Sequence, residues 1–297
     1  MDIGGTVIKI EGRVLRIARP DADHYQSLLN PELVLSDLRK ADARIDLFSF
    51  MQLMPETTPK YAYPMEWDNQ AVLPITSFDN WWKQIRSEAR NRARQAEKKG
   101  VVLREVAFDD RLVRGIWEIY NECPMRQERP FPHYGKDIGV VHREAATYLD
   151  SSFFIGAYLG EQLIGFVKLT CDQTRTQANF MNIIAMVQHR DKAPTNALVA
   201  HAVRVCAERK IAFLVYQNFT YGKKEHDSLT KFKENNGFQG VNLPRYYVPL
   251  TALGHAALRL GLHRRIAERL PESFANRLRG LRTAWHNRKL QSAAQSS

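Results

Sequence analysis

The spacing of hydrophobic and polar residues predicts a regular succession of strands and helices after residue 100. Apolar side chains that recur every three or four residues predict amphipathic helices, and short runs of β-branched or aromatic residues predict strands. The resulting order is strand, two helices, three antiparallel strands, helix, strand, helix and strand. The ranges are 101–106, 109–121, 137–149, 153–159, 162–170, 179–187, 195–209, 211–216, 227–236 and 245–250.

The first hundred residues and the last fifty have weaker patterns. Alternating residues over 6–18 predict a hairpin with its turn at Glu11-Gly12. The other expected elements are short helical pieces over 21–40, strands at 44–54 and near 69–75, a long helix from Asp79 to Lys99 ended by Gly100, and a helical tail over 251–290 broken at Gly261 and Pro271.

Composition places the chain among ordinary globular proteins. Of its 297 residues, 44% are hydrophobic and 25% are charged, which is enough apolar material for a core. No apolar run reaches the ~18 residues that cross a membrane, and the first residues lack the features of a secretory signal. Cys123, Cys171 and Cys206 are too isolated for a disulfide framework or a zinc site. We therefore expect a cytoplasmic protein with reduced thiols and no metal.

Positive charge is concentrated in two segments. The net charge is +11, with eight Lys or Arg against three Asp or Glu in residues 78–104, and nine against two in residues 251–297. Such segments indicate anionic partners, which could be membrane headgroups, nucleic acid or a phosphorylated substrate. The alternative is a solvated helix face that keeps the protein soluble. Composition leaves both open, together with the oligomeric state.

Three segments carry a likeness to a known family. Residues 153–166 have the pattern of a hairpin in the middle of a domain, residues 195–217 that of a helix and a short strand, and residues 229–238 that of a closing helix followed by Gly-Phe. A basic stretch over 90–101 precedes them. Taken together in this order, the segments resemble the GNAT superfamily of acyltransferases, especially the Fem-type and polysaccharide-associated branch.

The resemblance implies a fold and a division of the chain. The implied fold class is α/β (α+β), with a GNAT-type mixed, mostly antiparallel sheet and helices on both faces. An N-terminal β-containing extension would precede it, and a C-terminal helical arm would follow. We accordingly expect an extension over 1–100 that ends in a basic helix, an acyltransferase domain over 101–250, and a basic amphipathic tail over 251–297.

The resemblance also implies where a donor would bind. Two parallel strands, here 179–187 and 211–217, would separate, and the acyl-amide arm of acyl-CoA would pair with the first. The helix that starts near Thr195 would direct its free N–H groups at the pyrophosphate. The residues expected to bind this cofactor are Ala185, Met186, Val187, Arg190, Lys192, Thr195 and Asn196.

The phosphate loop departs from the family pattern. Ala193 and Thr195 stand where the family has its small residues, so both glycines are absent, and Pro194 has no N–H to donate. The implied function is transfer of an acyl group from acyl-CoA to an amine or hydroxyl acceptor, in cell-envelope or polysaccharide metabolism. Fem-type relatives often use aminoacyl-tRNA, so an aminoacyl-tRNA-dependent transferase is one alternative. A non-catalytic nucleic-acid-binding module is another.

The candidate catalytic residues are Tyr221, His133 and Asn182. Many relatives place a Tyr general acid one residue after the Phe of the closing helix, where this chain has Lys233, and Tyr221 is a candidate substitute. His133 titrates near neutrality and could act as a base. Asn182 could bond substrate, or it could satisfy neighbouring backbone groups.

The loop at 121–136 is the expected wall of an acceptor site for a small molecule, a glycan or a peptide precursor. Its arginines could bind a phosphate or a carboxylate. The alternative is a proline-stiffened surface loop whose arginines pair with Glu122 and Glu128. The expected substrate-binding residues are Arg126, Arg129, Tyr134, Gln217 and Asn218.

Residues 272–290 predict a basic amphipathic arm. Phe274, Leu278, Leu281 and Trp285 form an apolar stripe opposite several arginines. Such an arm either packs on the protein or rests on an anionic membrane surface. The expected partners therefore include a peripheral anionic membrane contact and, through the basic helix, tRNA.

Overall fold

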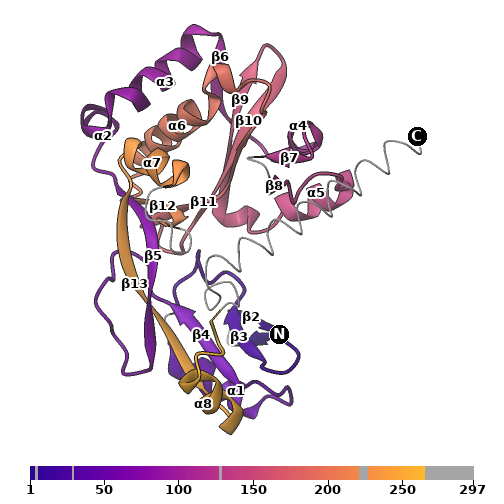
Figure 1. The fold of residues 1–297 in the computed structure, drawn as a ribbon, viewed down its shortest axis with the longest axis vertical. Coiled ribbons are helices and arrows are strands. Elements are labelled where there is room, and N and C mark those ends of the chain that lie inside the picture. Colours follow the sequence, from indigo (N-terminus) through magenta and orange to yellow (C-terminus); the bar gives the residue numbers. More distant parts are fainter. Residues whose placement is uncertain (4–5, 29, 127–128, 221–226, 265–297) are drawn as a thin grey trace. The chain divides into compact units, whose positions relative to one another are not determined.

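The computed structural model describes residues 1–3, 6–28, 30–126, 129–220 and 227–264 (Figure 1). These residues form two compact units, each of which draws on several parts of the chain. The three consecutive segments expected from the sequence therefore do not correspond to the units. The predicted arm over 272–290 lies outside the described residues. Unit 1 comprises the described residues within 1–89, 169–181 and 203–264, and unit 2 those within 90–168 and 182–202.

Four elements run from one unit into the other. They are α3 (Ser87–Lys98), β10 (Gln162–Cys171), β11 (Gln177–Ala185) and α6 (Pro194–Glu208). The last three fall close to the ranges predicted from the sequence. Each had a clear hydrophobic pattern within its own residues, which is why the sequence located them.

Unit 1 is built on strands in the order β1-β2-β3-β4-β13-β5-β12-β11. Most pairs are antiparallel, while β3 with β4 and β11 with β12 are parallel, so the predicted mixed and mostly antiparallel sheet is confirmed. The predicted hairpin over 6–18 is β2 and β3. The strand bounds are β1 (Asp2–Ile3), β2 (Thr6–Glu11), β3 (Ile17–Pro20), β4 (Leu47–Met51), β5 (Met65–Pro74), β12 (Phe213–Asn218) and β13 (Gln239–Pro249).

Strand β13 is longer than the sequence predicted. We expected it only over 245–250, but it pairs with β5 over residues 239–246 and with β4 over residues 245–249. The added residues include Gly240, Asn242 and Pro244, which have a low strand propensity. These residues form a strand because they pair with β5, which is distant in the sequence, so the local pattern did not predict it.

The core of unit 1 packs the helix α1 (Pro31–Lys40) on the sheet. Leu35, Phe48 and Phe50 are buried together, and the Tyr246 ring lies 5.0 Å from the ring of Phe50. Asn30 caps α1 because its side chain accepts a hydrogen bond from the Leu33 N–H. This core fixes β4 and β13, to which the C-terminal helix of the unit attaches.

The predicted long helix from Asp79 to Lys99 is two helices. Helix α2 (Phe78–Gln84) is capped by Ser77, not Asp79, and it stops at Ile85, which has an extended backbone. Ile85 is buried. The break places this apolar side chain in the core before α3 begins at Ser87. The hydrophobic pattern continues across the break, so the sequence alone suggested a single helix.

Unit 2 contains strands in the order β11-β10-β9-β6. Strands β6 (Val101–Val106) and β9 (Ser152–Leu159) pair antiparallel over their length, and a tight turn at Gly160-Glu161 joins β9 to β10. Helices α4 (Asp110–Asn121) and α5 (Ile138–Ala145) start one residue after the predicted positions and are capped by Asp109 and Asp137. Helix α5 ends before the predicted residue 149. Two short strands, β7 (Met125–Arg126) and β8 (Arg129–Pro130), lie in the predicted loop.

The remaining helices of unit 1 are α7 (Ser228–Asn235) and α8 (Ala252–Arg259). Asp227 caps α7 as predicted, because its carboxylate accepts a hydrogen bond from the Thr230 N–H at 2.8 Å. None of the helices within the described residues has the length and apolar character needed to cross a membrane.

Candidate functional site

Strands β11 and β12 are adjacent and parallel, as the resemblance implied. Residues 177–179 of β11 pair with residues 213–215 of β12. The pairing ends there, although both strands continue. Within unit 1 an aromatic contact follows the last pair, since the rings of Phe180 and Tyr216 lie 5.2 Å apart. Within the described residues of unit 1, the last residues of β12 are therefore not paired with β11 through the main chain.

Lys233 is buried beside this end of β12. The residue is 0% exposed, and its Nζ donates a hydrogen bond to the carbonyl oxygen of Asn218. The Nζ also lies 4.7 Å from the centre of the Tyr216 ring. Burial of the ammonium group lowers the pKa of Lys233 to about 8. The residue that replaces the family's Tyr is therefore a cation at neutral pH that can give up a proton.

The predicted substrate-binding residues Gln217 and Asn218 lie at a bulge in β12. Pairing with β5 shifts its register between Val215 and Asn218, and Gln217 has a φ of +38°. A positive φ is unfavourable for a residue other than glycine, and it persists where the surrounding structure holds it. The Gln217 side chain is exposed. The sequence contained no signal for this bulge.

Two amide side chains of β11, Gln177 and Asn179, form a buried polar contact in unit 1 that we did not predict. Gln177 accepts a hydrogen bond from the Met54 N–H at 2.9 Å and donates one to Asn179 at 3.3 Å. Among the described residues, Asn179 Nδ2 and Gln70 Nε2 are buried without a hydrogen-bond partner. Buried amide groups of this kind call for a water or a ligand atom. In the sequence, the sign of this contact was that polar amide residues occur inside predicted strands.

In unit 2, Glu122 binds the main chain that follows β11. One carboxylate oxygen accepts a hydrogen bond from the Val187 N–H at 2.8 Å, and the other accepts one from the Gln188 N–H at 2.7 Å. Glu122 is the C-cap residue of α4, where the helix dipole disfavours a negative charge. The two N–H groups offset this cost. The N–H groups of Val187 and Gln188 therefore already donate to a carboxylate of the protein itself.

Arg126 binds the same segment from its carbonyl side. Its guanidinium donates to the carbonyl oxygens of Ala185 and Ile119, both at 2.8 Å, and lies 3.3 Å from the Glu122 carboxylate. It also lies over the Phe131 ring at 4.2 Å. Burial lowers the pKa of Arg126, although Glu122 opposes this. The structure thus contains the Arg126–Glu122 pair that we gave as the alternative to substrate binding.

The predicted phosphate loop carries its own counter-charge. Asp191 accepts hydrogen bonds from Lys99 at 3.1 Å and from Lys192 at 3.3 Å, and the hydrogen bond from Lys99 is the main reason that the pKa of Asp191 is lowered. Ala193 has a φ of +51°, a left-handed conformation that the family's glycine would adopt more easily. Thr195 lies in the first turn of α6, where N–H groups have no partner within the helix.

His133 is held in the loop between α4 and α5. Its ring stacks on Tyr120 with 4.3 Å between the ring centres, and its Nδ1 lies 3.2 Å from Lys136 Nζ. Burial and the nearby Lys136 lower the pKa of His133, while Glu144 opposes them. The imidazole is therefore neutral at physiological pH, which is the form that a general base requires.

The other predicted site residues differ in exposure, and Arg129 pairs with Arg126 between β7 and β8. Asn182 is half-buried on the part of β11 that belongs to unit 2, and Arg129 and Tyr134 are exposed. Tyr221 lies outside the described residues. Within the part of the chain that the structure describes, no cluster of three or more His, Cys, Asp or Glu side chains could hold a metal ion.

Coenzyme A at the position that the resemblance implied would compete with these contacts. The N–H groups of Val187 and Gln188 donate to Glu122, and the Met186 N–H donates to the carbonyl oxygen of Ile164 at 2.8 Å. A donor arm that pairs here would find these groups already in use. A pyrophosphate would in addition meet the negative charge of Glu122.

The fold is similar to that of solved structures with which the chain shares little sequence identity. The structure of FemX aligns with a TM-score of 0.55 at 10% identity, covering 80% of this chain and 83% of FemX. L-PGS from Bacillus licheniformis aligns with a TM-score of 0.58 at 11% identity, covering 86% of each chain. No protein-family model and no curated protein matches the sequence. The chain therefore shares its fold with FemX and L-PGS.

Proposed function

We propose that this chain is an aminoacyl transferase whose donor is the aminoacyl ester of a tRNA and whose acceptor is an amine or a hydroxyl of a cell-envelope precursor. The observation that carries the proposal is the double hydrogen bond from the Val187 and Gln188 N–H groups to the Glu122 carboxylate. The fold, which is shared with FemX and L-PGS, supports a transferase in general. The contacts of Glu122 favour aminoacyl-tRNA over acyl-CoA as the donor.

A charged hydrogen bond of this kind is difficult for a thioester donor to replace. Hydrogen bonds to a carboxylate are roughly twice as strong as those between neutral groups, and the two here share one acceptor group. Coenzyme A would have to displace this carboxylate while bringing more negative charge. An aminoacyl ester on RNA has no pantetheine arm, so it does not require these main-chain groups.

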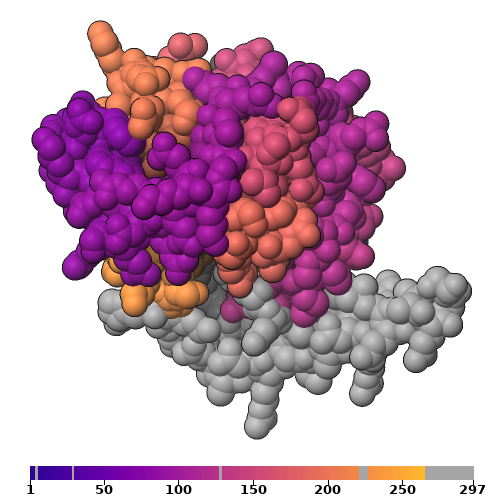
Figure 2. Space-filling model, turned by 90° about the horizontal axis from the view of Figure 1, so that it is seen from above, coloured from indigo at the N-terminus to yellow at the C-terminus, as the bar shows by residue number. Residues whose placement is uncertain are grey.

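Exposed cations on α3 support an RNA donor. Arg92, Arg94 and Lys98 are exposed on this helix, and the purple segment that contains α2 and α3 lies at the surface in Figure 2. Cations of this kind bind phosphates irrespective of base sequence. The helix was expected from the sequence to contact tRNA, and its exposure is what such a contact needs.

The proposed chemistry is direct transfer. The acceptor nitrogen or oxygen attacks the ester carbonyl, a new amide or ester bond forms, and the ribose oxygen of the tRNA leaves and takes up a proton. Lys233 is the proposed source of positive charge and of that proton, because it occupies the family's general-acid position and has a pKa of about 8.

An acyl-CoA donor is the second candidate. It is favoured by the first turn of α6, where Thr195 and Asn196 are partly exposed and present N–H groups of the kind that bind phosphate. Ala193 also adopts the left-handed conformation expected of the loop. The two candidates differ in the chemistry of the donor, so one assay separates them.

The test offers both donors to the full-length protein in parallel. A pool of tRNA charged with labelled amino acids and a labelled acetyl-CoA are each incubated with an extract of envelope precursors and lipids. We expect label to move to an acceptor from charged tRNA, and Lys233→Met to abolish the transfer while Lys40→Met, on an exposed site, does not. Transfer from the thioester alone would refute the proposed donor.

A further inference from the structure

Helix α8 is attached to unit 1 by one face. Thr251 caps the helix and also donates a hydrogen bond to the Asp46 carboxylate at 2.8 Å, and the Leu250 N–H donates to the Asp46 carbonyl oxygen at 2.9 Å. At Gly254 a Cβ atom would lie 1.9 Å from that same carbonyl oxygen, so the helix approaches β4 as closely as a glycine allows. This attachment fixes which face of α8 is turned outward.

The outward face and the turn after it are apolar. Leu253 is 39% exposed, Leu260 is 71% exposed and Leu262 is 45% exposed. Single exposed leucines are common, but three within ten residues on one short element form a patch. Leu260 and Leu262 lie on either side of Gly261, so they extend from the end of the helix.

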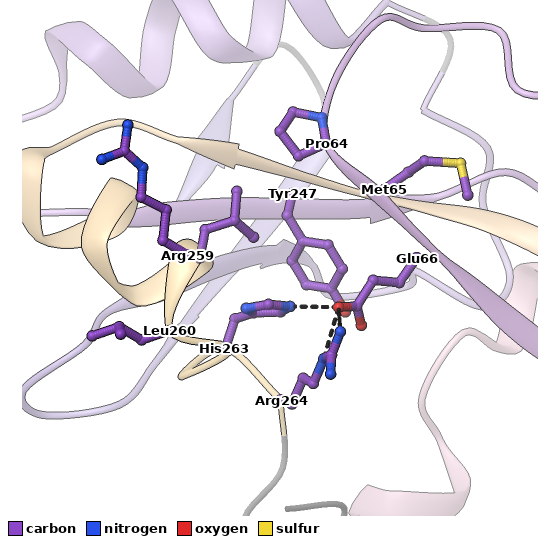
Figure 3. Close-up of a pocket in the computed structure, with 10 residues that line it drawn as sticks. Pro64, Met65, Glu66, Tyr247, Arg259, Leu260, His263 and Arg264 are labelled. Carbon is purple, nitrogen blue, oxygen red and sulfur yellow. Dashed lines mark hydrogen bonds and ion pairs between the residues drawn. The ribbon is translucent and has the colours of Figure 1, made fainter.

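Cations surround these leucines, and no acidic residue occurs between Leu250 and Arg264 in the sequence. Arg259 and Arg264 are exposed. Figure 3 shows that His263 and Arg264 both point at Glu66, whereas the guanidinium of Arg259 is turned away from them. The hydrogen bonds from Arg264 and His263 lower the pKa of Glu66 against the effect of its burial.

A cavity of about 300 Å³ lies beside the patch (Figure 3). Its lining includes Met65, Leu258, Arg259, His263 and Arg264. His263 is buried, and among the described residues its Nδ1 has no hydrogen-bond partner. The lining also includes Glu66, whose carboxylate binds Arg264, so the apolar wall and Arg259 are the parts of the cavity that suit a lipid headgroup.

We propose that α8 and residues 260–264 form a membrane-contact surface that binds an anionic bilayer. Leu253, Leu260 and Leu262 enter the boundary between headgroups and acyl chains, and Arg259 and Arg264 contact anionic headgroups. An anionic bilayer fits better than a protein partner because the segment 251–264 exposes two arginines and contains no acidic residue, while the neighbouring Glu66 is bound by Arg264 and leaves Arg259 for the headgroups. This surface is independent of the donor proposed above.

The experiment is flotation of the full-length protein with vesicles. Vesicles of phosphatidylglycerol mixed with phosphatidylcholine are compared with vesicles of phosphatidylcholine alone, at low and at high salt. We expect binding to the anionic vesicles that weakens with salt. The Leu260→Ser/Leu262→Ser variant should bind roughly tenfold more weakly, because it loses apolar area that the bilayer would bury. Arg259→Gln should also bind more weakly.

Matched controls separate this surface from a general loss of hydrophobicity or charge. Leu33 is 63% exposed on α1, and Lys40 is exposed on the same helix, so Leu33→Ser and Lys40→Gln change similar groups elsewhere in unit 1. Both should bind as the wild type does, and all variants should keep the wild-type melting temperature. The proposal is overturned if the wild type does not float with anionic vesicles, or if the leucine variant floats as well as the wild type.

Discussion

Glu122 and Arg126 illustrate what a single residue contributes in this protein. Together they bind the Ala185 carbonyl and the N–H groups of Val187 and Gln188, where β11 ends. The sequence analysis anticipated their pairing as an alternative. It could not anticipate the contact with residues some sixty positions away, because nothing in the local pattern of α4 indicates which backbone groups it meets.

Substituting Glu122 should destabilise unit 2. In Glu122→Ala both N–H groups lose their acceptor, and because the Val187 hydrogen bond is only part-buried and the Gln188 hydrogen bond is exposed, we expect a loss of about 1 kcal/mol. Glu122→Gln should be intermediate, because one amide oxygen can serve only one of the two donors well. Urea denaturation measures the change, with Glu118→Ala as the control, since Glu118 is exposed on the same helix. Equal stability of Glu122→Ala and the control would mean that these hydrogen bonds contribute little.

The two buried lysines should make stability depend on pH. Burial lowers the pKa of Lys168 and of Lys233 to about 8, whereas an unfolded lysine titrates near 10.4. Between these values the unfolded chain binds more protons than the folded one, so the two groups make the free energy of unfolding rise with pH. Denaturation at several pH values should show this rise reduced in Lys168→Met and Lys233→Met. A wild-type rise that both variants retain would show that neither lysine causes it.

Lys233 also shows the limit of a sequence comparison at the residue scale. Its departure from the family's Tyr was visible in the sequence. Its burial, its contact with Asn218 and its lowered pKa were not, because they depend on β12, which lies beside α7 only in the folded chain.

At the scale of elements, the sequence was most informative where an element depends on its own residues. The starts of α4, α5 and α7 were predicted to within one residue. Each start is fixed by an aspartate cap, which is a contact between near neighbours. The break at Ile85 and the first half of β13 were missed. Both depend on distant partners: the core that takes up the Ile85 side chain, and strand β5, which supplies the hydrogen bonds of β13.

Gly254 should be indispensable for the attachment of α8. A Cβ atom at this position would lie 1.9 Å from the Asp46 carbonyl oxygen, so Gly254→Ala must displace the helix or the strand. We expect a loss of about 1–3 kcal/mol, which is typical of overpacking. Ala256→Ser, on the exposed face of the same helix, should stay within about 0.5 kcal/mol of the wild type. If the two variants melt alike, α8 is not held by this close approach.

At the scale of the whole molecule, the order of elements along the chain was enough to predict the fold class. That order did not predict which strands are neighbours in the sheet. The parallel neighbours β11 and β12 were expected from the resemblance and are confirmed. The position of β5 between β12 and β13 was not foreseen, since β5 comes from the extension that precedes the family-like region. A local pattern contains no information on which distant strand will pair.

The charge distribution leads to a prediction for the full-length protein. If α3 binds tRNA, the affinity should fall steeply with salt, and each phosphate-binding cation that is removed should reduce the slope against log salt by roughly one. Arg92→Gln, Arg94→Gln and Lys98→Gln should each have this effect in a fluorescence titration with tRNA. Lys40→Gln should not. Unchanged slopes in all three variants would place the RNA contact elsewhere.

The choice of donor is tested most directly by equilibrium binding to the wild-type protein, before any acceptor is known. Coenzyme A and a non-hydrolysable analogue of aminoacyl-tRNA are titrated separately into the full-length chain at the same low salt. With Glu122 on the N–H groups of Val187 and Gln188, the tRNA analogue should bind saturably and coenzyme A should show no saturable binding. Saturable binding of coenzyme A, with none of the tRNA analogue, would contradict the account.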